Sequence, residues 1–178
     1  MKRLASMLAA GVLAAATVVA TAGAASAGPT PTHRIQCSGG ILTSIFVQVG
    51  TTQFFPGVPN KVVSGSTVRL KPTANGTTTW CFTQIPSGPN AGQWTIASLN
   101  GGFAMTSRAT TPGADVLVQT NSAVASQRWI INNGSTGSTI TIRNVKTNLF
   151  LRVRNSGPAL NQTVTTGAMA TEWIIGVA

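Results

Sequence analysis

Three tryptophans recur along the chain, and each one opens a short apolar run. Trp80, Trp129 and Trp173 are all followed directly by two apolar side chains. Trp129 lies 44 residues before Trp173, and the similar patterns around Ile96 and Ile142 lie 46 residues apart. A repeat of this length indicates a fold built from stacked or rotated copies of one unit.

Each copy has the same internal order: a glycine turn, a short strand, a polar loop and a strand that carries the tryptophan. The glycine lies fifteen or sixteen residues before the tryptophan, at Gly65, Gly113 and Gly157. An apolar position follows each glycine, at Val68, Val116 and Leu160. We expect these positions to be equivalent in the folded chain.

The local pattern is that of strands throughout. Short alternating runs rich in Thr, Val and Ile are separated by Gly, Pro and Asn clusters, and no segment keeps a helical period. With two strand pairs in each of three copies, this predicts an all-β fold, a pseudo-threefold β-trefoil of three lobes with about twelve strands. The lobes are expected at approximately 41–90, 91–136 and 137–178, with the three tryptophans in a shared core. A propeller has a similar period, but three blades are fewer than propellers use.

Residues 1–27 have the pattern of a secretory signal peptide. Lys2 and Arg3 precede an alanine, valine and leucine run that ends at Ala25-Ser26-Ala27. We therefore expect an extracellular mature protein with an extended leader over 28–40 and one trefoil domain over 41–178. No later stretch has the roughly 18 uninterrupted apolar residues that a spanning helix requires.

The reactive residue types are few. Cys37 and Cys81 are the two cysteines, and in an exported chain we expect them to form a disulfide. No metal site, cofactor or catalytic group is expected, because the mature chain has only His33, Asp115 and Glu172 as further strong ligands or acid-base groups, and they are far apart in sequence.

Positive charge dominates the composition. Without Lys2 and Arg3, ten basic and two acidic residues remain, a net charge of +8. Such an excess attracts anionic partners through its long-range field. The basic residues are spread along the chain rather than clustered, so we do not expect specific nucleic-acid binding.

The stretch Gln127-Arg128-Trp129, which follows the turn strand "GADVLVQT", resembles the Gln-x-Trp signature of ricin-type lectin domains. The resemblance covers roughly Ile45 to Val177 and is strongest in the second lobe. In the first lobe Thr78 stands at the glutamine position, and in the third lobe no glutamine lies two residues before the tryptophan. The resemblance implies a β-trefoil that binds carbohydrate.

The sugar-binding side chains of that family are not matched. The resemblance places the family's aspartate near Met105 in the second lobe and at Arg152 in the third, with no acid in the first. It places the family's aromatic ring at Lys71, Gln119 and Thr163, and the family's asparagine at Thr77, Ser126 and Ala170. None of these residues has the expected side chain, so we expect galactose and lactose to bind no more tightly than millimolar.

The candidate ligand contacts are basic, polar or aromatic residues near these positions: Lys71, Gln119, Arg152, Arg154, Phe54, Phe55 and Trp94. Phe54 and Phe55 are adjacent in an extended segment, so we expect one of them to be exposed. Two functions remain open. The first is a secreted, non-enzymatic binding module for glycans or anionic cell-surface or wall polymers. The second is a protein-interaction trefoil, such as a toxin adaptor subunit or a protease inhibitor.

Overall fold

The computed structural model describes residues 35–37, 39–154 and 163–176, so the expected signal peptide lies outside the described residues. Within them, twelve strands form three sets of four: β2 (Gly40–Val49), β3 (Thr52–Gly57), β4 (Arg69–Lys71) and β5 (Trp80–Gln84); β6 (Trp94–Ser98), β7 (Ala104–Thr106), β8 (Leu117–Gln119) and β9 (Arg128–Asn133); β10 (Thr139–Asn144), β11 (Phe150–Val153), β12 (Val164–Gly167) and β13 (Trp173–Gly176). A short strand, β1 (Ile35–Cys37), precedes them, and a 3-10 turn, η1 (Ala125–Gln127), precedes β9. No helix in the described part of the chain is long and apolar enough to cross a membrane.

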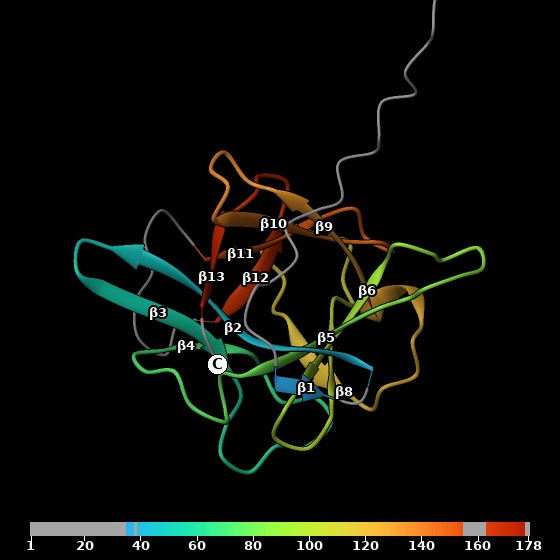
Figure 1. Cartoon of the computed structure of the whole chain (residues 1–178), viewed down its shortest axis with the longest axis horizontal. Coiled ribbons are helices and arrows are strands. Elements are labelled where there is room, and N and C mark those ends of the chain that lie inside the picture. Colours follow the sequence, from blue (N-terminus) through green and yellow to red (C-terminus); the bar gives the residue numbers. More distant parts are fainter. Residues whose placement is uncertain (1–34, 38, 155–162, 177–178) are drawn as a thin grey trace, which may run out of the picture.

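Six strands close a barrel (Figure 1). Around it, the antiparallel neighbours are β2, β5, β6, β9, β10, β13 and again β2. The first and last strands of every lobe pair in the same register, with the tryptophan opposite Thr43, Trp94 or Ile140. The repeat in the sequence is therefore a repeat in the backbone.

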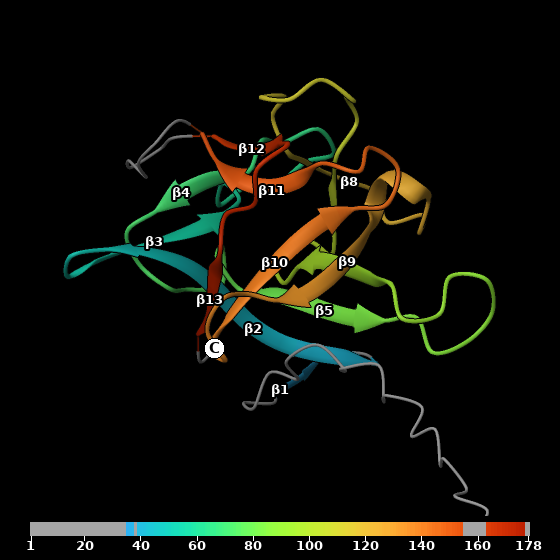
Figure 2. The ribbon, with the colours of Figure 1, turned by 90° about the horizontal axis from the view of Figure 1, so that it is seen from above.

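The other six strands form three hairpins, β3–β4, β7–β8 and β11–β12, which cover one end of the barrel (Figure 2). Their second strands meet around the axis. The N–H of Val68 donates to the carbonyl of Val116, Val116 to Val164, and Val164 back to Val68, each over 2.9 Å. This closed ring of hydrogen bonds is the pseudo-threefold centre of a β-trefoil.

One predicted equivalence is wrong. Sequence matching places Leu160 at the position of the axial valines, but the structure has Val164 there, and Leu160 lies outside the described residues. The axial valine lies 12 or 13 residues before the tryptophan in the first two lobes, but only 9 residues before Trp173. The connection in the third lobe is shorter, so counting back at a fixed spacing shifts the match.

The three tryptophans are completely buried, as the sequence predicts. Each indole N–H donates to a backbone carbonyl of the hairpin in the same lobe: Trp80 to Pro56 at 2.9 Å, Trp129 to Met105 at 3.1 Å and Trp173 to Leu151 at 3.1 Å. A buried indole needs such a partner, because an unpaired buried N–H is costly. The same bond therefore ties each hairpin to the barrel.

The expected disulfide between Cys37 and Cys81 is confirmed, with 5.8 Å between the two Cα atoms. It joins β1 to β5, and β1 also pairs with β2. The described end of the expected leader is thus part of the sheet. The two cysteines are 44 residues apart in the sequence. Closing a loop of that length stabilises a fold by about 4 kcal/mol in the chain-entropy description.

Replacing Trp129 by alanine removes both the largest core side chain of the second lobe and the bond to Met105. We expect Trp129→Ala to lower the free energy of unfolding by about 3–5 kcal/mol, measured by chemical denaturation. Val124→Ala is the control, because Val124 is 49% exposed and an exposed change costs within about 0.5 kcal/mol. A loss below about 1 kcal/mol for Trp129→Ala would contradict the assigned role.

Candidate functional site

The first lobe carries an open hollow beside its cap hairpin. The hollow has a volume of about 320 Å³ and is formed by the end of β3, the loop before β4 and β4 itself, through Gly57, Val58, Pro59, Ser66, Thr67, Arg69 and Lys71. A volume of this size is at the lower end of the range for small-ligand sites. We call it the cationic hollow, because Arg69 and Lys71 are its charged residues.

Lys71 lines this hollow, and its side chain packs against Gly57. A Cβ atom at Gly57 would lie 2.7 Å from Thr78 Cγ2 and 3.0 Å from Lys71 Cδ, so a glycine here leaves room for both side chains. The ammonium group donates to Thr77 Oγ1 at 2.9 Å. Asn75 Oδ1 in turn accepts from the N–H and the hydroxyl of Thr77, at 2.9 and 2.6 Å. The position of the charge is therefore set by packing and by a short polar chain.

Partial burial lowers the pKa of Lys71, because removing water disfavours the charged amine. An ammonium group has three donors, and Thr77 takes one of them. Arg69 lies two residues earlier on the same strand, so its side chain leaves the strand on the same side. The hollow thus presents two cations, and no carboxylate lies among the residues that line it.

The second and third lobes do not repeat this arrangement. The hairpin registers make Lys71 equivalent to Gln119 and Gly167, and make Gly57 equivalent to Thr106 and Arg152. In the third lobe the basic side chain therefore comes from the first strand of the hairpin. Arg152 lies over Gly167 so closely that a Cβ there would overlap its Cδ.

Two matched positions of the predicted sugar site are corrected by these registers. The residue equivalent to Met105 is Leu151 rather than Arg152, and the residue equivalent to Lys71 is Gly167 rather than Thr163. The short connection before Trp173 explains the shift at Thr163, whereas Arg152 lies before that connection and is simply one residue beyond the true equivalent.

Arg154, another candidate contact, joins two lobes. Its guanidinium lies 2.5 Å from a carboxylate oxygen of Asp115, and the two side chains are 44% and 39% exposed. The position equivalent to Asp115 in the first lobe is Thr67, which lines the cationic hollow. Asp115 therefore offsets the charge of Arg154, whereas the first lobe has a neutral side chain at the matching place.

The prediction for Phe54 and Phe55 is wrong, because both are buried, with 9% and 5% exposure. They do point to opposite faces of β3, but both faces are covered. Phe54 belongs to the core, and the ring of Phe55 packs 5.2 Å from that of Phe46 on β2. Neither residue is available as a surface contact.

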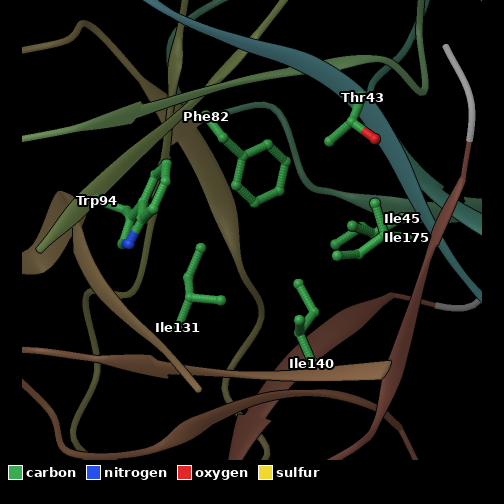
Figure 3. Close-up of a pocket in the computed structure, with 7 residues that line it drawn as sticks. All are labelled: Thr43, Ile45, Phe82, Trp94, Ile131, Ile140 and Ile175. Atoms are coloured by element: carbon green, nitrogen blue, oxygen red, sulfur yellow. The ribbon is translucent and has the colours of Figure 1, made fainter. Parts of the chain in front are cut away.

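Trp94 belongs to an apolar cavity inside the barrel (Figure 3). Its lining includes two threefold sets, Thr43, Trp94 and Ile140 and then Phe82, Ile131 and Ile175, together with Ile45. The cavity measures about 10 Å³, which is the space of about one water molecule. It is a packing defect of the core, too small for a sugar.

Gln127, the glutamine of the Gln-x-Trp signature, holds a loop. It is buried, donates to the carbonyl of Thr120 at 2.8 Å and accepts from the N–H of Ser122 at 2.9 Å. Threonine hydroxyls replace it elsewhere: Thr78 accepts from the N–H of Asn75 at 2.7 Å, and Thr171 from that of Val153 at 3.2 Å. The signature is therefore structural in this chain.

A second hollow, between the first and second lobes, was not foreseen from the sequence. It has a volume of about 420 Å³ and is lined by Asn60, Asn75, Gly76, Thr77, Leu99 and Asn100. The available signal was the pair of Asn-Gly dipeptides at 75–76 and 100–101, which as turn markers give no hint of a shared hollow. We call it the amide hollow.

The described residues contain no group of three His, Cys, Asp or Glu side chains that could hold a metal ion. Asp115 is paired with Arg154. Glu172 accepts from the N–H and hydroxyl of Ser135 and from the hydroxyl of Thr139, at 2.7, 2.8 and 2.9 Å.

Comparison with known proteins places these features in a family. Residues 76–167 match the family described as "Ricin-type beta-trefoil lectin domain-like". The designed threefold-symmetric protein ThreeFoil is similar in structure, with a TM-score of 0.67, 13% identity, and coverage of 77% of this chain and 99% of that one. No curated protein matches the sequence.

Two natural structures are also similar. A lectin from Polyporus squamosus, bound to a human-type influenza-binding epitope, has a TM-score of 0.59 and 16% identity over 79% of this chain and 50% of that one. An exo-beta-1,3-galactanase from Clostridium thermocellum has a TM-score of 0.65 and 10% identity over 77% and 30% of the two chains. This chain thus spans half or less of these two proteins. Such identities show the fold alone.

Hydrogen bonds to the carboxylate of Glu172, chiefly from the Ser135 hydroxyl and then from the Ser135 N–H and the Thr139 hydroxyl, lower its pKa. A lowered folded-state pKa means that the carboxylate stabilises the fold above its unfolded pKa, and that this contribution is lost as the pH falls through the folded value. We expect the melting temperature of Glu172→Gln to depend less on pH than that of the parent between about pH 5 and pH 2. Identical curves for the parent and Glu172→Gln would contradict the assignment.

Proposed function

Because the chain belongs to the family of ricin-type beta-trefoil lectin domains, we propose that it is a secreted binding module for glycans or cell-surface polymers that carry negative charge. Domains of this family are typically non-catalytic, although the galactanase match shows that a similar fold can form part of an enzyme. The observation that carries the proposal is the cationic hollow, in which Arg69 and Lys71 face an open space without a carboxylate in its lining.

The chemistry of the hollow suits an anion. Ammonium and guanidinium groups form charge-assisted hydrogen bonds with carboxylate, sulfate and phosphate groups, and these bonds are about twice as strong as neutral ones. Burial has already removed part of the hydration of Lys71 and lowered its pKa. A bound anion favours the charged amine and offsets that loss. The overall positive charge adds long-range attraction.

Neutral galactosides fit this hollow poorly. The hairpin positions equivalent to Lys71 have glutamine and glycine, and none of the three has an aromatic ring for a sugar face. A neutral sugar would have to replace water on two cations with hydroxyl groups alone. We therefore expect galactose and lactose to bind with dissociation constants of about a millimolar or weaker.

We also propose that the protein is secreted. The pattern of residues 1–27 supports export, and the disulfide between Cys37 and Cys81 is of the kind that persists outside the cytoplasm. A protein-interaction role is less well supported, because Phe54 and Phe55 are buried and no longer mark a contact surface.

Lys71→Ala tests the proposed site against a charged polymer. Removing one charge-assisted hydrogen bond should lower the affinity for dextran sulfate roughly tenfold, measured by calorimetry at fixed salt. Unmodified dextran should show no binding, and binding of the parent to dextran sulfate should weaken as salt is raised.

The matched control is Lys146→Ala, which removes the same side chain from an exposed position in the third lobe. We expect this variant to lose less than about twofold in affinity. An equal loss in the two variants would mean that only net charge attracts the polymer. Binding to dextran that equals binding to dextran sulfate would overturn the proposed ligand class.

A further inference from the structure

The amide hollow borders the cationic hollow. Pro59 lines the cationic hollow and the next residue, Asn60, lines the amide hollow. On the other side, Lys71 lines the cationic hollow and donates to Thr77, which lines the amide hollow. The peptide bond between Pro59 and Asn60 and the hydrogen bond between Lys71 and Thr77 therefore connect the linings of the two hollows.

The amide hollow offers neutral hydrogen-bonding groups. The Asn100 amide donates to the carbonyl of Asn60 at 2.9 Å, which leaves the Oδ1 atom of Asn100 for a ligand. Asn75 uses its Oδ1 atom to hold Thr77, which leaves its NH2 group. Within the described residues, these two groups and the Asn60 side-chain amide have no hydrogen-bond partner.

An apolar surface completes this hollow. Leu99 is 50% exposed and lines the hollow beside the amides. A sugar ring has polar hydroxyl or acetamido groups at its edge and C–H groups on its face, so it can use amides and an aliphatic side chain together. No acidic or basic side chain lines the amide hollow.

The loop between the hollows is held in place before any ligand binds. Asn75 anchors it, since its carbonyl accepts from the hydroxyls of Thr78 and Thr79 at 3.0 and 2.8 Å and its N–H donates to Thr78. An ordered loop lowers the entropy that binding must overcome. The polar chain from Lys71 through Thr77 to Asn75 is continuous, so a charged group and a neutral ring bound on the two sides would be close neighbours.

We propose that the two hollows bind one acidic oligosaccharide, with an acidic sugar residue on Arg69 and Lys71 and an adjoining neutral sugar residue on the amides and Leu99. This inference rests on the proposed function and narrows its ligand class. The expected ligand is therefore a polymer in which charged and neutral sugars alternate, rather than one that is charged at every sugar.

The test compares free glucuronate with a tetrasaccharide of alternating glucuronate and N-acetylglucosamine, by calorimetry on the parent protein. We expect the tetrasaccharide to bind at least about tenfold more tightly. The double variant Asn60→Ala/Leu99→Ala should lose this advantage while its affinity for free glucuronate stays unchanged. Its control, Asn132→Ala/Val124→Ala, removes two exposed side chains of the same kinds from the second lobe and should keep the advantage.

The outcomes separate the two proposals. Equal affinity for glucuronate and the tetrasaccharide would overturn the shared site while leaving an anion site in the cationic hollow. An advantage that survives in Asn60→Ala/Leu99→Ala would also overturn it, because the neutral residue would then lie elsewhere. Failure of both acidic probes to bind would remove the proposed function and this inference with it.

Discussion

The hydrogen bond from each tryptophan indole to its own cap hairpin is the constraint on which the rest of the structure depends. It is made three times, to the carbonyls of Pro56, Met105 and Leu151, by side chains that are fully buried. It sets the height of each hairpin on the barrel, and the axial ring of valine hydrogen bonds then sets the position of the hairpins around it. In the first lobe the accepting residue directly precedes Gly57, so the core places part of the lining of the cationic hollow.

The three lobes show how one scaffold presents different surfaces. A glycine faces a basic side chain across the hairpin in the first and third lobes, but the roles of the two strands are exchanged. Lys71 extends over Gly57 beside an open hollow, whereas Arg152 extends over Gly167 and donates to the carbonyl of Val153. Nearby, Asp115 adds negative charge to the surface between the second and third lobes. Small changes on the same frame thus leave an open hollow lined by two basic side chains beside the first-lobe hairpin.

Much of the fold could be predicted because the repeat places large apolar side chains at similar intervals, and burial leaves few alternatives for three such tryptophans. The disulfide could be predicted because only one pairing exists. The equivalences at Leu160 and Thr163 failed because the length of the loop before Trp173 is free to vary while hydrogen-bond register is not, and Arg152 was matched one residue too far along its strand. The expectation that Phe54 or Phe55 is exposed failed because the alternation of side chains along a strand does not tell whether the second face of the strand is covered. The amide hollow joins three separate segments, at residue 60, residues 75–77 and residues 99–100, so no local pattern shows it.

The central claim is that the first lobe, rather than the whole basic surface, holds the anionic ligand. Amide chemical-shift mapping of the 15N-labelled protein during titration with a short sulfated oligosaccharide tests it most directly. The account predicts that the largest shifts fall on residues 57–71 and on the Asn75–Thr77 loop, with the signals around Arg152 and Arg154 nearly unchanged. Shifts of similar size over all three lobes, or a maximum in the third lobe, would contradict it.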